Sequence, residues 1–185
     1  MKLSILLALG SVLHPGTQVR NVDGNRIEPL QVSKGHAEAL FFVTQDCPVS
    51  NVYSHEIRRI CEEYAQKGLG CSLVYVDAAL SDDQARKHAQ EYGHGSYPKI
   101  VDRQHALVKA TGAEITPTAV LVAAGGSIAY RGRIDNLYAS LGKARRVVTE
   151  HDLRDAIEAV LSGKPVARAE APPVGCYIEP LRLEK

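Results

Sequence analysis

The chain has 185 residues, which is enough for one domain with a substantial core. Its 22 basic and 21 acidic side chains give a net charge of +1, so the charge balance gives no reason to expect nucleic acid or an acidic membrane surface as a partner. There is no Trp and there are only two Phe, so the core must consist mainly of aliphatic residues and Ala.

The N-terminal segment combines a lysine, an apolar run and small residues. Lys2 precedes the apolar run at 3–9, and Gly10 and Ser11 follow it. This pattern is typical of a secretory signal. We interpret residues 1–14 as a signal peptide or an N-terminal tail. A signal predicts a periplasmic or other extracytoplasmic location, whereas a tail predicts a cytoplasmic one. No later run approaches the ~20 apolar residues of a membrane span, so we expect none in the mature chain.

The first two thirds of the chain alternate between strand and helix patterns. Residues 38–44 form a continuous apolar run, which is typical of a strand buried on both faces. Val49, Tyr53 and Ile57 then recur at helical spacing. In chain order we predict extended segments at 17–22 and 26–31, a strand at 38–44, a helix from Pro48 to Gly68, a strand at 71–76, a helix capped by Ser81 and ending at Gly93, an extended piece at 98–101 and a short helix at 107–110.

The last third predicts a hairpin, a long loop, one helix and a tail. The hairpin strands are 118–123 and 128–131, and the helix runs from a cap at Thr149 to Gly163. This order predicts an α/β fold for residues 15–164: three α/β/α layers with a mixed central sheet. Residues 132–149 are expected to form the loop, and residues 165–185 an extended tail rich in Pro and Ala that carries Cys176.

Cys47 follows the buried strand and immediately precedes Pro48, which suits the first turn of a helix. A cysteine at a helix N-terminus lies beside free N–H groups and the positive end of the helix dipole, which stabilise a thiolate. We therefore expect Cys47 to be a nucleophile. The alternative is an inert cysteine buried at the end of a strand.

A second motif lies just before the predicted hairpin, where Thr116 and Pro117 occur in the sequence ITPT. Together with the strand–Cys-Pro–helix junction at Cys47, it resembles the thioredoxin superfamily. The resemblance implies the thioredoxin fold, with Pro117 in the cis form and packed against Cys47. The alternative is an ordinary trans proline at the start of an edge strand.

Finer motifs resemble the redoxin branch, the alkyl hydroperoxide reductase and thiol-specific antioxidant group. TQDC at 44–47 matches the T-x-x-C part of the peroxiredoxin pattern, although Leu40 replaces the proline expected four residues earlier. In peroxiredoxins the threonine and a later arginine polarise the peroxide, which implies these roles for Thr44 and Arg133. The chain is also similar to exported redoxin-domain proteins with a TECPISN-type site and YRGRID, HDLR and GCxI motifs. Here these read TQDCPVSN, YRGRID (130–135), HDLR (151–154) and GCYI (175–178).

The sequence Cys-Pro-Val-Ser departs from the Cys-x-x-Cys of thioredoxins because Ser50 takes the place of the second cysteine. Another thiol must therefore resolve a mixed disulfide or a sulfenic acid formed on Cys47. Cys176 is the candidate, since a ten-residue extended tail reaches ~30 Å. The alternatives are an external thiol, a pairing of Cys176 with a partner protein, or a free Cys176. We expect the supporting residues to be Thr44, Asp46, Pro48, Ser50, Thr116, Pro117 and Arg133.

Cys61 and Cys71 fall on the buried face of a helix and at the start of a buried strand, so we expect both to be core residues. A bridge between them remains open in an oxidising compartment. The histidines form no ligand set, and we expect neither a metal nor another cofactor.

Together these patterns predict an antioxidant-type, thiol-dependent oxidoreductase. Its substrates would be protein thiols and disulfides or hydroperoxides, and an external thiol would be its reductant. The rival interpretation is a redox-silent binding module, or an accessory subunit of an exported electron-transfer assembly, and Ser50 is its best support.

Overall fold

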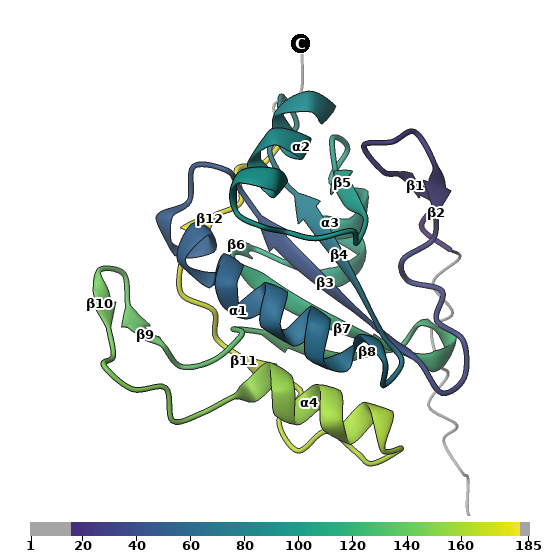
Figure 1. Cartoon of the computed structure of the whole chain (residues 1–185), viewed down its shortest axis with the longest axis vertical. Helices are drawn as coiled ribbons and strands as arrows, with labels where there is room; N and C mark the ends of the chain where they lie inside the picture. The colour runs from purple at the N-terminus through teal and green to yellow at the C-terminus, as the bar shows by residue number, and fades with distance from the viewer. Residues whose placement is uncertain (1–15, 182–185) are drawn as a thin grey trace, which may run out of the picture.

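The computed structural model describes residues 16–181, so the predicted signal or tail at 1–14 lies outside the described residues. A six-stranded sheet forms the centre of the molecule (Figure 1). The sheet is mixed, as predicted: β3, β4 and β5 are parallel, β7 is antiparallel to β3 and β8, and β11 is parallel to β8. In spatial order its strands are β11 (Glu170–Ala171), β8 (Ile128–Gly132), β7 (Thr118–Ala123), β3 (Ala37–Val43), β4 (Leu69–Tyr75) and β5 (Lys99–Val101).

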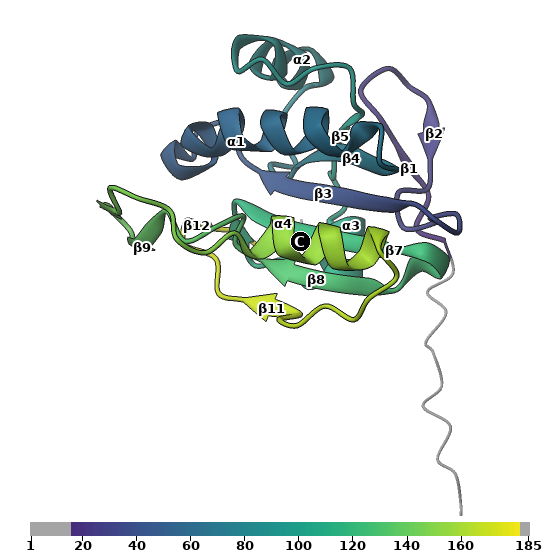
Figure 2. The same cartoon turned by 60° about the horizontal axis from the view of Figure 1, so that its bottom comes forward.

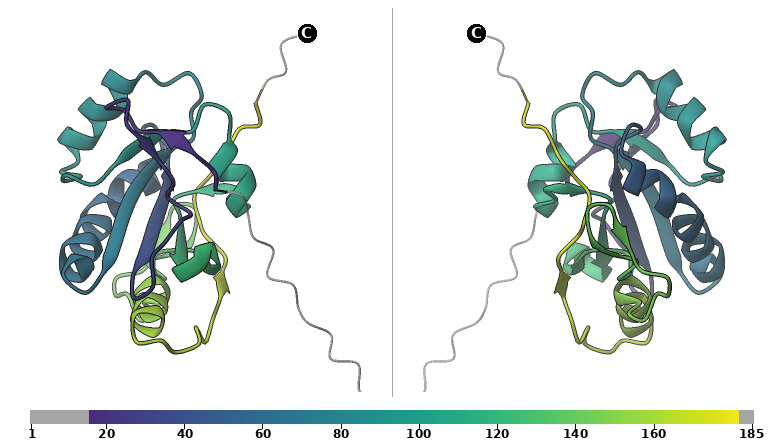
Figure 3. Two further views of the ribbon diagram at one scale, coloured as in Figure 1. Left: turned by 90° about the vertical axis from the view of Figure 1, so that its right-hand side faces the viewer. Right: turned by 90° about the vertical axis from the view of Figure 1, so that its left-hand side faces the viewer.

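Helices cover both faces of this sheet, which confirms the three predicted layers (Figures 2 and 3). Ala39 and Phe41 of β3 face one set of helices, while the alternate residues Leu40 and Phe42 face the other side. Within residues 16–181, no helix is both long enough and apolar enough to cross a membrane. The first face carries α1 (Pro48–Ala65), α2 (Asp82–Glu91) and α4 (Asp152–Leu161), and the second carries α3 (Ala106–Thr111).

Two helix starts illustrate how local chemistry sets the boundaries. Ser81 caps α2 as predicted, and Gln84 completes a reciprocal capping box. The predicted cap of the last helix, Thr149, is wrong: the N-cap of α4 is His151. The side chain of Asn136 binds Thr149 instead. The Thr149 hydroxyl accepts from Asn136 Nδ2 at 2.8 Å, and the Thr149 N–H donates to Asn136 Oδ1 at 2.9 Å.

Several short strands complete the fold. Residues 17–22 and 26–31 contain the small hairpin of β1 (Val19–Arg20) and β2 (Arg26–Ile27). Residues 132–149, expected as a loop, contain a second hairpin of β9 (Tyr138–Ser140) and β10 (Lys143–Ala144). A short turn, η1 (Ala124–Gly126), connects β7 to β8.

The C-terminal tail is extended over its described part, as predicted, and it packs against the rest of the fold. Its strand β11 extends the central sheet beside β8. Its second strand, β12 (Cys176–Tyr177), pairs antiparallel with β6 (Ile115–Thr116), close to the start of α1 (Figure 1). Before β11, Arg168 donates to Asp152 Oδ1 at 2.8 Å and to Glu150 Oε2 at 3.0 Å, which holds the tail against the start of α4.

Cys61 and Cys71 form a disulfide between α1 and β4, with their Cα atoms 6.1 Å apart. Both residues are buried in the core, which confirms the prediction, and the bridge that the sequence left open between them is formed. The cause is the packing of α1 on β4, which brings the two Cβ atoms within bridging range.

Candidate active site

Cys47 is the N-cap of α1, where the chain leaves the central strand β3. Its backbone is extended, and its carbonyl accepts from the N–H of Asn51 at 3.0 Å, the first bond of the helix. Pro48 occupies the first turn, in which no side chain is acidic. Cys47 is 1% exposed, so the free N–H groups of the helix act on its thiol with little screening by water.

Cys176 reaches Cys47 from the tail. In the pairing of β12 with β6, Cys176 lies opposite Thr116. The thiol of Cys176 donates to Cys47 Sγ at a distance of 2.8 Å. The next bond along the pair runs from the N–H of Ile178 to the carbonyl of Glu114 at 2.9 Å. The structure therefore brings together the two cysteines that the sequence singled out.

Gly175 permits this close approach. A Cβ atom at position 175 would overlap the carbonyl oxygen of Thr116 and contact the ring of Pro117. Only glycine allows the tail backbone to lie this close to the Thr116–Pro117 segment. This steric requirement gives a physical reason for the glycine of the GCYI motif.

Thr116 links the groups of the site. Its peptide bond to Pro117 is cis, as the resemblance implied. Its carbonyl accepts from the Cys47 thiol at 3.3 Å, and its hydroxyl donates to the carbonyl of Cys176 at 3.4 Å. The hydroxyl of Thr44 lies 3.3 Å from the hydroxyl of Thr116. The segment before Pro117 thus contacts both cysteines and the predicted threonine.

The two thiols have opposite pKa shifts. Burial raises the pKa of Cys47, but hydrogen bonds from Cys176, Ser50 and Thr116 outweigh burial, so the net direction is downward. Burial, the hydrogen bond to Cys47 and the charge on Cys47 raise the pKa of Cys176 to about 11. Cys47 is therefore the thiol that ionises first. The S–H group of Cys176 stabilises the resulting Cys47 thiolate by donating a hydrogen bond to it.

A cavity of about 970 Å³ opens at the two cysteines. Of the predicted residues, Thr44, Asp46, Cys47 and Cys176 line it. Further lining side chains that the sequence analysis did not single out include Gln45, Asp77, Arg103, His105 and Tyr177.

Arg133 does not line this cavity, which departs from the role that the resemblance implied for it. Its Nε donates to Asp152 Oδ2 at 2.7 Å, and its terminal nitrogen pairs with Glu150. The arginine that does line the cavity is Arg103, which donates to Asp82 Oδ1 at 2.9 Å. In the sequence nothing distinguished Arg103 from other surface arginines.

A buried polar network supports the loop before Cys47. Asn51 Nδ2 donates to the carbonyl of Gln45 at 2.9 Å, and Asn51 Oδ1 accepts from Nε2 of His88 at 3.0 Å. The hydroxyl of Tyr75 lies 2.9 Å from the other ring nitrogen of His88. Burial lowers the pKa of His88, which favours the neutral ring with its proton on Nε2. No local pattern predicts this network, because its members come from three separate elements.

Comparisons with known proteins agree on a family and a fold. The redoxin family model matches residues 11–144. No curated protein matches the chain significantly. An uncharacterised conserved protein from Geobacillus kaustophilus is 25% identical with a TM-score of 0.77, and the match covers 94% of this chain and 96% of that one. A hypothetical protein from Sinorhizobium meliloti is also 25% identical, with a TM-score of 0.74 and coverages of 94% and 95%.

A more distant solved structure is a secreted disulfide oxidoreductase from Mycobacterium tuberculosis that is homologous to Escherichia coli DsbE. It is 13% identical with a TM-score of 0.50, and the match covers 60% of this chain and 78% of that one. At this identity the likeness concerns the fold alone. The α/β fold of the present chain is thioredoxin-like.

Proposed function

Because the chain belongs to the redoxin family, we propose that it is a thiol-disulfide oxidoreductase in which Cys47 is the nucleophile and Cys176 the resolving thiol. The observation that carries this proposal is the 2.8 Å separation of the two sulfur atoms at the N-terminus of α1. The downward shift in the pKa of Cys47 supports its role as the attacking group.

The reaction consists of two exchanges. The Cys47 thiolate attacks one sulfur of a client disulfide, forming a mixed disulfide and releasing the other client sulfur as a thiolate. Cys176 loses its proton and attacks Cys47 Sγ, which forms the Cys47–Cys176 disulfide and releases the second client thiolate. The client disulfide gains two electrons, and the two cysteines of the chain supply them. An external thiol reductant then restores the dithiol.

Two observations favour a protein disulfide over a hydroperoxide as the substrate. Arg133 is bound to two carboxylates and does not line the cavity, so it does not supply the positive charge that the peroxide role requires. In addition, the site already accommodates a polypeptide strand with a cysteine, since β12 pairs with β6. The remaining support for a peroxide is Thr44, which lines the cavity.

The disulfide between Cys61 and Cys71 supports a location outside the cytoplasm. Structural disulfides persist mainly in oxidising compartments. We therefore include a periplasmic or other extracytoplasmic location in the proposal. Its test is the redox state of this cysteine pair in protein isolated under thiol-blocking conditions.

The test of the function is single-turnover exchange with a disulfide-linked peptide. Reduced wild-type protein should release both peptide thiols and end as a Cys47–Cys176 disulfide in a non-reducing peptide mass map. Cys47→Ser should release none. Cys176→Ser should release one peptide thiol and accumulate a mixed disulfide on Cys47. The matched control is a protein in which Cys61 and Cys71 are both replaced by alanine, which should react like the wild type.

Release of peptide thiols by Cys47→Ser would overturn the proposal. In a parallel experiment, reduced wild-type protein is treated with one equivalent of hydrogen peroxide. Faster oxidation of Cys47 by peroxide than by the peptide disulfide would move the function to peroxide reduction. If Cys47 reacts with neither and titrates near the ~8.5 of a free cysteine, the chain is a redox-silent binding module.

A further inference from the structure

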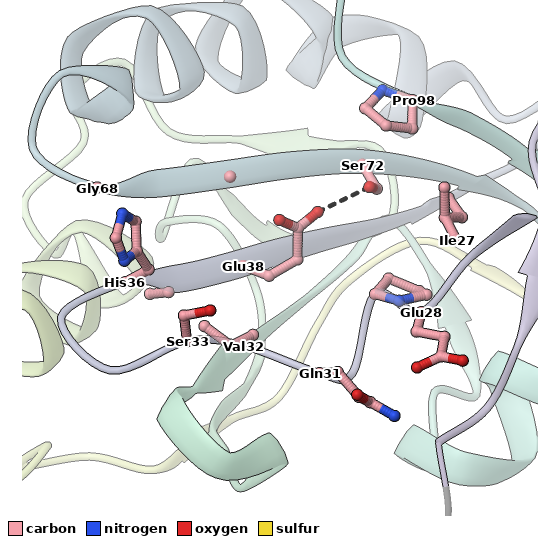
Figure 4. Close-up of a pocket in the computed structure, with 13 residues that line it drawn as sticks. Ile27, Glu28, Gln31, Val32, Ser33, His36, Glu38, Gly68, Ser72 and Pro98 are labelled. Atoms are coloured by element: carbon pink, nitrogen blue, oxygen red, sulfur yellow. Dashed lines mark hydrogen bonds between the residues drawn. The ribbon is translucent and has the colours of Figure 1, made fainter. Parts of the chain in front are cut away.

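A second pocket lies at the opposite end of β3 from Cys47. Its central group is Glu38, the second residue of that strand, whose side chain projects toward β4 (Figure 4). Glu38 Oε1 accepts a hydrogen bond from the hydroxyl of Ser72 at 2.7 Å. Among residues 16–181, no group donates a hydrogen bond to Glu38 Oε2. One oxygen of a largely buried carboxyl group is therefore left for a ligand.

The opposing strand makes room for this oxygen. Glu38 is paired in register with Gly70 of β4. A Cβ atom at position 70 would overlap Glu38 Oε2. The glycine thus keeps open the space in which the carboxyl group stands.

The pocket has a volume of about 340 Å³, which is within the range of small-molecule sites. Ile27, Val32 and Pro98 give it apolar walls, His36 also lines it (Figure 4), and no lysine or arginine of residues 16–181 does so. Glu28 also contributes to the lining, but its carboxylate is directed away from Glu38 (Figure 4) and accepts from the side chain of Gln18 at 3.1 Å. Glu38 is therefore the acidic group at which a ligand would be held.

We propose that this pocket binds a small aliphatic amine, with its ammonium group on Glu38 Oε2 and its alkyl chain against Ile27, Val32 and Pro98. Burying a carboxylate without a cation costs free energy. An ammonium group on Glu38 Oε2 would reduce this cost, while its alkyl chain packs against the apolar walls. Burial raises the pKa of Glu38 to about 7. Such a group ionises readily at mildly alkaline pH when a cation is supplied.

The geometry also selects among cations. Ser72 already donates to Oε1, so the two-pronged fork of a guanidinium group would compete with Ser72 at that oxygen, whereas an ammonium group needs only Oε2. Among the described residues no cluster of three acidic, histidine or cysteine side chains is placed to hold a metal ion. One free carboxylate oxygen falls short of the six to eight oxygen ligands of calcium.

The test is a titration of the protein with n-butylammonium chloride. Binding is monitored by NMR through the backbone amide chemical shifts of Glu38, Gly70 and Ser72. Sodium chloride at equal ionic strength and neutral n-butanol are the ligand controls. At pH 8 the wild type should show saturable shifts at these amides with butylammonium alone. With a pKa near 7, the ionised fraction of Glu38 falls about tenfold between pH 8 and pH 6, so the affinity should fall about tenfold.

Two variants decide the role of the carboxylate. Glu38→Gln retains an oxygen for Ser72 but lacks the charge, and it should lose the saturable shifts at both pH values. Gly70→Ala should lose them by filling the space beside Oε2, while its circular dichroism reports whether it folds. Equal binding by the wild type and Glu38→Gln, or no saturable shift in the wild type at concentrations on the order of 10 mM, would overturn the proposal.

Discussion

The buried hydroxyl of Ser50 lies one helical turn after Cys47, and it contributes to the lowered pKa of that thiol. Within the described part of the chain, Ser50 Oγ makes no hydrogen bond to the neutral Cys47 thiol or to any other group, and the residue is 2% exposed. The hydroxyl is therefore available to donate to a thiolate. The residue that replaces the second cysteine of a Cys-x-x-Cys motif thus favours ionisation of the first.

Ser50→Ala should raise the pKa of Cys47. A hydrogen bond to a charged group contributes about 1.5–3 kcal/mol, so the expected rise is about 1–2 pH units. The measurement is the pH dependence of Cys47 alkylation by iodoacetamide. Ser54→Ala is the control, because the Ser54 hydroxyl donates to the Ser50 carbonyl and not to a cysteine. An unchanged pKa in Ser50→Ala would remove Ser50 from the site.

Gly175→Ala should separate the tail from the site without touching either cysteine. The added Cβ overlaps the carbonyl oxygen of Thr116, so β12 must move away from β6. We expect formation of the Cys47–Cys176 disulfide to slow by at least about tenfold, since the sulfur atoms lose their alignment. Alkylation of Cys47 should persist. Gly95→Ala is the matched control, because a Cβ atom there makes only ordinary contacts with Tyr97.

Arg133→Ala should lower stability and leave the chemistry of Cys47 nearly unchanged. The substitution leaves Asp152, which is 7% exposed, without one of its two arginine partners. We expect the free energy of unfolding to fall by about 1–3 kcal/mol. The rate of Cys47 oxidation by hydrogen peroxide should change less than about threefold. A large loss of that rate in a folded variant would restore the peroxide role of Arg133.

Replacing Cys61 and Cys71 together by alanine should destabilise the protein by about 2–3 kcal/mol, as expected for a bridge that closes a short loop. The measurement is the urea midpoint of the variant and the wild type. In the presence of a strong thiol reductant the difference between the two proteins should shrink markedly. A difference that reductant does not affect would show that packing, and not the bridge, is responsible.

Glu38→Gln should change how stability depends on pH. The pKa of Glu38 is raised from 4.5 to about 7, so the folded state holds the proton more tightly than the unfolded state. The stabilising contribution of the protonated group is complete below about pH 4.5 and is lost as the pH rises through 7. The difference in the free energy of unfolding, variant minus wild type, should therefore rise by about 2–3 kcal/mol from pH 5 to pH 8. A constant difference across that range would contradict the raised pKa.

Local patterns in the sequence predicted the parts of the fold that depend on local spacing. The continuous apolar run before Cys47 and the helical spacing after it were sufficient to predict β3 and α1. The neighbouring proline was sufficient to predict that Cys47 begins the helix. The hairpin of β7 and β8 followed in the same way from two short apolar runs and a turn.

The sequence could not reveal the contacts made between distant elements. Two-residue strands such as β12 and β6 have no measurable period, so their pairing was not predicted. The bridge between Cys61 and Cys71 depends on how α1 packs on β4. The position of Arg133 depends on two carboxylates at the start of α4, and these, not the cysteine, bind its side chain. In each case a tertiary contact determines the outcome.

The pairing of the tail with β6 has a kinetic consequence. A thiol tethered by a short chain acts at an effective concentration in the millimolar range, and Cys176 is in addition already aligned with Cys47. A dissolved thiol would need to exceed that concentration to reach Cys47 first. Mixed disulfides with clients should therefore be short-lived in the wild type, and the reductant should meet the chain mainly as its internal disulfide.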